Sequence, residues 1–336
     1  MDLSSMKPSS NNRRKRKQKN LDPLTDLYAQ EDTMDFQLAN NNVSGNTVDM
    51  STKQKKSQEK KVRQGGNRSG TQRVTSAHQD AHKIRIVYED DDILVVHKPR
   101  FIACHPSTSH TKDTLVQQVI GHLGGDRELL SNLDCTPEVD RPGIVHRIDW
   151  QTSGLLIMAK NTAAHLNLKE QFQKHTIKRT YYCLTHNHFR DAQGVIDVSI
   201  GRHHSNPSKR VPLTDALTKK KQTFKDAFTK YKVLQLFTDG SGRNKYSLVR
   251  CNLKTGRTHQ IRVHLTHVGR PLVGDKLYGS KKQPFQQGAQ VLHAKSLGFV
   301  HPTTGKEMSF DSELPSYFAE ILKGLKEVKV DDRDIL

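Results

Sequence analysis

The chain lacks long apolar runs and paired cysteines. No apolar stretch approaches about 18 residues, the shortest length typical of a transmembrane helix, so no membrane span is expected. The first residues contain no apolar signal core, so secretion is not expected either. The four cysteines are scattered without CxxC spacing, which indicates reduced, small apolar residues rather than disulfides or zinc ligands. These absences favour a reducing, cytoplasmic location.

Negative charge is also scarce. The 54 Lys and Arg residues exceed the 35 Asp and Glu residues, which gives a formal net charge of +19. Such an excess suits a polyanionic partner, nucleic acid first and an anionic membrane surface second. Residues 1–82 hold 15 basic and nine acidic side chains, a net charge of +6, so +13 belongs to the remainder. Most of the excess charge therefore lies beyond residue 82.

Residues 1–82 have no hydrophobic periodicity. Ser, Asn, Gln, Lys and Arg dominate, and residues 64–70 have the composition of a linker. Such a segment cannot bury enough apolar surface to offset its ordering entropy, so we predict a disordered basic extension, followed by a folded domain over residues 83–330. Its basic run from Arg13 to Lys17 has three open interpretations: a nuclear import signal, an RNA-grasping arm or a solubilising tail.

Strand patterns prevail after residue 83. Alternating apolar residues and turn signals predict a hairpin over 84–97, strands over 177–184, 195–200, 228–237 and 246–253, and a second hairpin over 291–310. Helices are predicted over 114–123, over 161–175 with Asn161 as N-cap, from a Thr258 cap to about 267, and over 315–325. Residues 202–221 are polar and basic, which indicates a mobile loop or an RNA-facing insert. The count favours an α+β domain on a mostly antiparallel sheet with flanking helices.

The segment over residues 143–154 contains the strongest candidates for catalytic residues. It places a charged tetrad, His146 to Asp149, between apolar strand-like pieces and ends in the turn residues Thr152, Ser153 and Gly154. An ionised Asp149 beside Arg147 is a candidate nucleophile or base. Alternatively, the Asp and Arg form a structural pair that only ties the loop to the fold.

Three further blocks follow this segment. They contain Arg179 and Tyr181, then a basic helix around Arg262, then Leu292-His293-Ala294. An Arg fork can pair bidentately with a carboxylate such as Asp149 and keep it ionised and aimed. That arrangement suits a nucleophile at a sugar carbon. A hydrolase would normally use a second acid for the leaving group, and none recurs in these blocks, which weighs against hydrolysis.

Together these motifs resemble the RluA-type family of RNA pseudouridine synthases. His-Arg-x-Asp-x-x-Thr-Ser-Gly-Leu-Leu, over residues 146–156, resembles the signature loop of that family, and the three blocks follow in the family's order across about residues 85–325. The resemblance implies the pseudouridine synthase fold, a long mixed sheet with a central active-site cleft. Phe101 departs from the pattern, since it stands where the family usually has a glycine, and glycine reaches dihedral angles that Phe avoids.

The resemblance also implies a reaction. A uridine base in RNA is detached from its sugar, rotated in place and rejoined through carbon, without cofactor or metal. By matching position, Asp149 is the catalytic Asp, Arg262 its salt-bridge partner, and Tyr181 lies against the target base. Extruding a base costs a few kcal/mol, and Arg147 matches the arginine that stacks in the vacated space. Whether Asp149 attacks the sugar, attacks the base or abstracts a proton stays open.

Other residues in the same blocks are candidates for holding the substrate. To RNA binding we assign His146, Arg179, Arg257 and His259. The implied partner is structured RNA, ribosomal or transfer, bound by a monomer.

Three rival interpretations are weaker. The tetrad is similar to a kinase His-Arg-Asp loop, but Ile148 is inserted and no Asp-Phe-Gly follows. A metal at His259, His264 and His267 lacks a joining carboxylate or Cys. A non-catalytic RNA-binding protein would not need Asp149, Tyr181 and Arg262 together.

Overall fold

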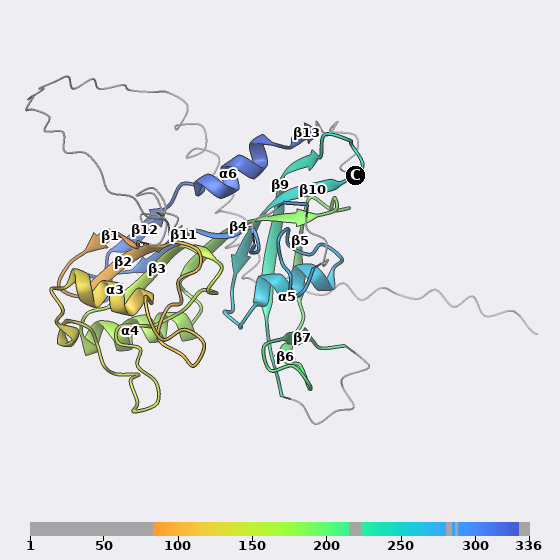
Figure 1. Cartoon of the computed structure of the whole chain (residues 1–336). Coiled ribbons are helices and arrows are strands. Elements are labelled where there is room, and N and C mark those ends of the chain that lie inside the picture. Colours follow the sequence, from red (N-terminus) through yellow and green to blue (C-terminus); the bar gives the residue numbers. More distant parts are fainter. Residues whose placement is uncertain (1–82, 215–222, 280–283, 286–287, 329–336) are drawn as a thin grey trace, which may run out of the picture. The chain divides into compact units, whose positions relative to one another are not determined.

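The computed structural model describes residues 83–214, 223–279, 284–285 and 288–328 (Figure 1). The predicted disorder of residues 1–82, including the basic run from Arg13 to Lys17, lies outside the described residues. So do residues 215–221 of the predicted basic loop.

A ten-stranded sheet runs through the described part, with the main order β1-β2-β3-β11-β4-β10-β9-β13 (Figure 1). In addition, β12 pairs with β11 and β5 pairs with β9. The strands are β1 (Arg85–Glu89), β2 (Ile93–Lys98), β3 (Ser153–Ala159), β4 (Lys178–His186), β5 (Gln193–Asp197), β9 (Phe228–Thr238), β10 (Lys245–Leu253), β11 (Leu292–Val300), β12 (Glu307–Asp311) and β13 (Lys326–Val328). The pairing of β3 with β11 is parallel and the other pairings of these strands are antiparallel. The predicted α+β class on a mixed, mostly antiparallel sheet is confirmed.

Helices bury both faces of the first half of the sheet. Helix α3 (Leu115–His122) packs against residues such as Leu94, whereas α4 (Thr162–Gln173) packs against its neighbour Val95. Adjacent residues of a strand point to opposite faces, so β2 and β3 are covered on both sides. This burial explains their continuous apolar runs, which do not alternate. A short 3₁₀ turn (Arg127–Leu129) follows α3.

Side-chain caps begin both helices, and the cap predicted at Asn161 is confirmed. The Thr114 side chain accepts a hydrogen bond from the Gln117 N–H, and the Gln117 side chain in turn accepts one from the Thr114 N–H, which forms a capping box. Asn161 caps α4 by accepting from the N–H of Ala164 at 2.9 Å. Among the described residues, each helix is too short or too polar to cross a membrane.

The second half of the sheet carries α5 (Gln260–His267) and α6 (Ser316–Lys323). A separate three-stranded sheet, β7-β6-β8, is formed by β6 (Ile200–Arg202), β7 (Arg210–Pro212) and β8 (Phe224–Lys225), and we call it the small sheet. Two predictions are wrong here. The strand predicted over 195–200 is split between β5 and β6, and the described part of the predicted mobile loop contains strand β7.

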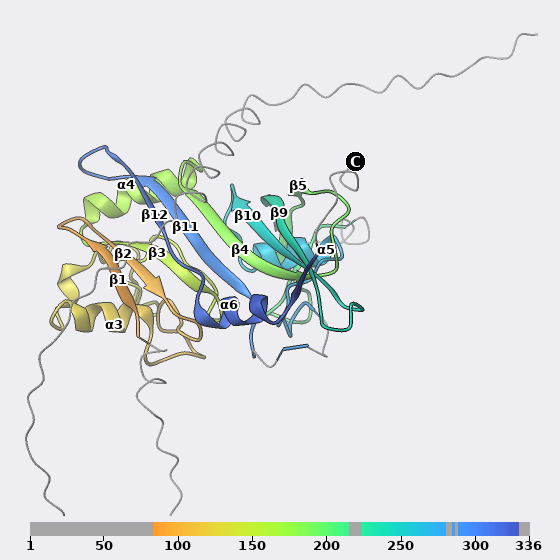
Figure 2. The same cartoon turned by 90° about the horizontal axis from the view of Figure 1, so that it is seen from above.

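Strand β11 lies between β3 and β4 and joins the two halves of the sheet (Figure 2). Its parallel contact with β3 is very close, because a Cβ atom on Gly154 would lie 2.2 Å from the carbonyl oxygen of Ala294. Gly154 also has a φ of +120°, which favours glycine. The segment over residues 143–152 therefore enters β3 directly beside the centre of the sheet.

Candidate active site

The loop over residues 143–152 is held mainly by its backbone and by one apolar side chain. The Gly143 N–H donates to the Ser131 carbonyl at 2.7 Å, and the Thr152 N–H donates to the Asp149 carbonyl at 3.0 Å. Ile148 is buried, and its carbonyl accepts from the Cys104 thiol at 3.4 Å. With Ile148 anchored in the core, Arg147 stays exposed and the Asp149 carboxylate lies in the cleft described below.

His146 fastens the start of the same loop. Its Nε2 accepts a hydrogen bond from the Ile157 N–H at 3.0 Å, and its ring lies 4.7 Å from that of Phe172. Burial, with a further contribution from Arg179, lowers the pKa of His146 to about 3. The imidazole is therefore neutral at ordinary pH, and its Nε2 is occupied within the fold.

A buried lysine fixes the carbonyl that follows Asp149. Lys98 has no exposed surface, and its Nζ donates to the carbonyls of Pro99, Ile102 and Trp150 at 2.9, 2.8 and 3.2 Å. Burial lowers its pKa to about 8, although Cys104 and Asp149 oppose this shift. The Trp150 carbonyl also accepts from the Phe101 N–H at 2.8 Å. Sequence reasoning assigned no role to Lys98.

Phe101 keeps the backbone conformation that glycine would take. Its φ is +64°, in the left-handed region, which for a bulky residue costs of order 1–2 kcal/mol. Its ring contacts Trp150 at 5.3 Å, and the Arg100 guanidinium lies 4.8 Å from its centroid. These contacts and the Trp150 hydrogen bond hold the strained residue in place.

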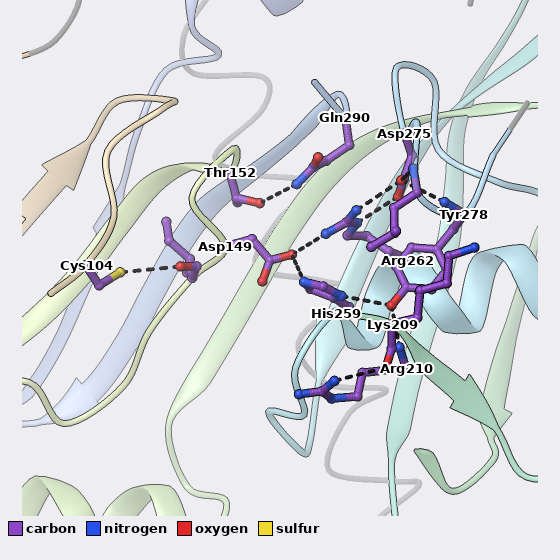
Figure 3. A network of polar contacts seen from close by, with 12 residues as sticks. Cys104, Asp149, Thr152, Lys209, Arg210, His259, Arg262, Asp275, Tyr278 and Gln290 are labelled. Atoms are coloured by element: carbon purple, nitrogen blue, oxygen red, sulfur yellow. Dashed lines mark hydrogen bonds and ion pairs between the residues drawn. The ribbon is translucent and has the colours of Figure 1, made fainter. Parts of the chain in front are cut away.

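Arg262, on α5, links two carboxylates. Its Nε and Nη2 donate to Asp275 at 2.7 and 3.0 Å, while its Nη1 donates to Asp149 Oδ2 at 3.1 Å (Figure 3). The bidentate fork expected for Asp149 is thus made with Asp275. Burial lowers the pKa of Arg262, but the two carboxylates outweigh it and the net shift is upward. The guanidinium remains charged and aimed at Asp149.

Asp275 is a site residue that the sequence analysis missed. Its side chain has no exposed surface, and its Oδ1 accepts from the N–H groups of Leu277 and Tyr278 at 2.9 and 3.1 Å. Gly274 permits this approach, since a Cβ there would lie 2.0 Å from the Ala289 carbonyl oxygen. The only available signal was the Gly-Asp pair preceding Tyr278. Because Asp275 is buried and fully engaged, it does not supply the leaving-group acid that a hydrolase would need.

The predicted residues surround one cleft of about 610 Å³. It is lined by all eight residues assigned from the sequence: Asp149, Tyr181, Arg262, Arg147, His146, Arg179, Arg257 and His259. Among the described lining residues, Asp149 supplies the sole carboxylate against five Lys and Arg side chains. The cleft therefore combines one anionic oxygen with a cationic wall that suits a phosphate backbone.

The wall formed by β4 holds Tyr181 and Arg179. Burial raises the pKa of the Tyr181 phenol; Arg179 opposes the shift and Asp149 adds to it. The phenol therefore stays protonated. Arg179 Nη2 donates to the carbonyl of Lys254 at 3.3 Å, and its guanidinium lies 5.4 Å from the Phe172 ring.

The segment that leads into α5 carries Arg257 and His259. Arg257 Nε donates to the Asp226 carbonyl at 2.8 Å. His259, not Thr258, is the N-cap of α5, with a left-handed φ of 60° and no side-chain capping bond, so the predicted Thr258 cap is wrong. Instead, His259 directs Nε2 toward Asp149 Oδ2 at 3.9 Å, and its Nδ1 lies 2.8 Å from the Tyr278 hydroxyl (Figure 3).

Comparisons with known proteins agree with this geometry. A family model described as RNA pseudouridylate synthase matches residues 92–267. The chain is 41% identical over 241 residues to an uncharacterized RNA pseudouridine synthase, YlyB, of Bacillus subtilis, covering 72% of each protein. It is 37% identical over 260 residues to ribosomal large subunit pseudouridine synthase D of Zymomonas mobilis, covering 74% of this chain and 75% of the relative.

A solved structure shows the same fold. Human RNA pseudouridylate synthase domain containing 1 superposes with a TM-score of 0.57 at 24% sequence identity. The match covers 75% of this chain and 91% of the human chain.

Proposed function

Because the chain belongs to the RNA pseudouridine synthase family, whose members are isomerases acting on RNA, we propose that it converts uridines of ribosomal RNA to pseudouridine, with Asp149 as the catalytic carboxylate. The substrate class is supported by the name of the Zymomonas mobilis relative, which refers to the large ribosomal subunit. The observation that carries the assignment of Asp149 is its ion pair with Arg262 at the floor of a basic cleft.

The geometry suits an anionic catalyst. The Asp149 side chain is 22% exposed, so it is open to a substrate, while Arg262 is only 6% exposed and is fixed by Asp275. A cation fixed in this way holds the Asp149 carboxylate in one direction before the substrate arrives. Asp149 then supplies the anionic oxygen that the rearrangement needs at the sugar or the base. Tyr181, protonated and buried in the cleft wall, lies against the base.

The cationic residues of the cleft grip the RNA. Arg147 is exposed beside Asp149, in position to stack in the space that a flipped uridine leaves. Arg179 and Arg257 extend the basic wall. Because phosphate contacts release counterions, binding weakens steeply as salt rises. His146 is the exception among the assigned residues, since its hydrogen bond to Ile157 makes it an anchor of the catalytic loop.

The protein acts as a monomer in a reducing compartment such as the cytoplasm. Cys183 Sγ and Cys251 Sγ lie 4.0 Å apart in the core and carry no disulfide. Residues 83–330 form the catalytic domain in this proposal, and residues 1–82 precede it as a basic extension.

The experiment is to map pseudouridine in total RNA from cells in which the gene has been deleted, after incubation with the full-length protein. Carbodiimide-dependent reverse-transcription stops that appear with the wild type identify the substrate. Asp149→Asn should abolish them, with a rate at least about 1,000-fold lower, because a catalytic carboxylate is not replaced by a neutral amide. RNA binding should persist.

Glu89→Gln is the matched control. Glu89 is 27% exposed and ion-paired with Lys160 Nζ at 2.9 Å, and neither residue lines the cleft. Stops confined to transfer RNA would revise the substrate class. Equal RNA binding by wild type and Asp149→Asn without any new stops would overturn the catalytic assignment.

A further inference from the structure

Tyr278 connects the small sheet to the catalytic loop. Its hydroxyl accepts a hydrogen bond from the Arg210 N–H of β7 at 2.8 Å and lies 2.8 Å from His259 Nδ1 (Figure 3). Tyr278 also belongs to the apolar cluster in which Ile200 of β6 packs against Val263 of α5. One phenol therefore contacts both the small sheet and His259, the N-cap of α5.

The contacts fix the direction of each proton. His259 Nε2 lies 3.9 Å from a carboxylate oxygen of Asp149, so the tautomer with hydrogen on Nε2 is favoured over one that turns a lone pair toward the anion. In that tautomer Nδ1 is an acceptor and needs a donor. The Tyr278 hydroxyl donates to it, while its oxygen accepts from Arg210. The two hydrogen bonds run in one direction, from Arg210 through Tyr278 to His259 Nδ1, and successive bonds of this kind polarise one another. The Nε2–H of His259 then faces Asp149 Oδ2 across 3.9 Å.

Tyr278 is held by the same carboxylate that holds Arg262. Asp275 Oδ1 accepts from the Tyr278 N–H at 3.1 Å, and the Arg262 guanidinium lies 5.0 Å from the centroid of the Tyr278 ring. Burial raises the pKa of Tyr278 to about 12, so the phenol keeps the proton that it donates. Asp275 thus helps to position both groups that face Asp149. It binds the Arg262 guanidinium directly, and it holds Tyr278, which bonds to the His259 imidazole.

We propose that Tyr278 is a positioning residue: it holds His259 with Nε2–H directed at Asp149, and it makes this alignment depend on the seating of the small sheet through the Arg210 N–H. The proposal rests on the proposed isomerase function. This gives the small sheet a second role besides its basic residues. Movement of β7 away from the cleft would remove the Arg210 N–H, which is the first donor in the chain of contacts from Arg210 through Tyr278 and His259 to Asp149. We call this chain the relay.

The test uses the full-length protein and the RNA identified by the mapping experiment. Tyr278→Phe removes the hydroxyl and keeps the ring, so kcat should fall about tenfold while KM changes less than twofold, as expected when alignment rather than binding is lost. Tyr88→Phe is the matched control, because it removes a hydroxyl that also makes a 2.8 Å hydrogen bond, to Asp90, outside the residues that line the cleft. Its kcat should equal that of the wild type.

A double-mutant cycle separates the relay from simple packing. His259→Asn keeps a residue that tolerates the left-handed conformation but removes the imidazole. If Tyr278 acts through His259, adding Tyr278→Phe to His259→Asn should lower kcat by less than twofold more. A further tenfold loss would show that Tyr278 acts independently and would overturn the proposal.

Nitrogen NMR of histidine-labelled protein gives a readout that does not require activity. The resonance of His259, assigned by its loss in His259→Asn, should report a proton on Nε2 in the wild type and a mixture of tautomers in Tyr278→Phe. A proton on Nδ1 in the wild type would overturn the relay even if the enzyme is active. An active wild type with unchanged kcat in Tyr278→Phe would overturn the relay alone. A wild type that forms no pseudouridine would overturn the proposed function, and the tautomer would still decide the relay.

Discussion

The two sides of the cleft are held in different ways. On one side, the loop of Asp149 is fixed by backbone hydrogen bonds, by the buried side chain of Ile148 and by a neutral histidine, His146. On the other, α5 presents Arg262, which is fixed by a buried bidentate ion pair with Asp275. The Asp149 carboxylate is therefore positioned by packing, and the Arg262 guanidinium is positioned by charge.

Because of this difference, the buried ion pair of the site is formed by Arg262 and Asp275, and Asp149 lies outside it. A buried ion pair is costly to desolvate and depends on both partners remaining in place. Asp149 carries little of that burden, because its side chain is 22% exposed and Arg262 is already neutralised by Asp275. A substrate can therefore contact Asp149, or Asp149 can be replaced, while Arg262 remains paired with Asp275.

The largest expected effect on folding follows from breaking the charged side. Asp275→Asn leaves the buried Arg262 without its main anionic partner and should lower the free energy of unfolding by about 3–5 kcal/mol. Urea denaturation measures the loss. On the packed side, Ile148→Val should cost only about 0.5–1.5 kcal/mol. The contrast between the two sides fails if Asp275→Asn costs no more than Ile148→Val.

A smaller loss of stability is expected from His146, on the side of the Asp149 loop, as the pH falls. The pKa of His146 is about 3 in the folded protein and near 6.5 when unfolded, so the unfolded chain binds the proton first. Stability contributed by the neutral ring is full above pH 6.5 and is lost as the pH falls toward 3. Between pH 6.5 and 4.5 this residue should account for about 2 kcal/mol of lost unfolding free energy.

His146→Gln tests this prediction, because Gln keeps an acceptor for the Ile157 N–H and does not titrate. The free energy of unfolding, measured by urea denaturation across pH 4.5–6.5, should decline less steeply in the variant. The variant retains the part of the decline that comes from other buried histidines such as His293, whose pKa burial also lowers to about 3. Identical slopes would show that His146 does not titrate in this range.

The smallest expected effect on the free energy of unfolding concerns Arg147, whose side chain is exposed on the loop and does not hold it in place. Arg147→Ala should leave the free energy of unfolding unchanged within about 0.5 kcal/mol. Affinity for the substrate RNA should fall about tenfold, because stacking on a base contributes roughly 1–3 kcal/mol. Filter binding at several salt concentrations checks this. An unchanged salt slope supports stacking, whereas a slope lower by about one identifies a phosphate contact instead.

Local signals predicted more of the molecule than distant ones did. The cap at Asn161 could be predicted because its side chain bonds to a backbone group three residues away. The cap of α5 could not, since His259 takes a left-handed conformation beside a tyrosine 19 residues further on. Composition carries no record of such a contact.

The same distinction applies to the site. The blocks around Asp149 and Arg262 predicted which residues line the cleft. They did not predict that the Arg262 fork is occupied by Asp275, or that Tyr278 bonds to the backbone of a residue 68 positions away. The sequence predicted which residues line the cleft, but it did not predict their partners, because those depend on how distant segments meet in the fold.

The position of β11 has a consequence for the synthesis of the enzyme. This strand comes late in the chain, at residues 292–300, yet it lies at the centre of the sheet between β3 and β4. While the chain emerges from the ribosome, its earlier strands can form two separate halves, each with an unpaired edge that is prone to mispairing. Asp149 precedes β3 and Arg262 follows β10, so the two residues of the ion pair lie on segments that β11 joins through its pairing with β3 and β4.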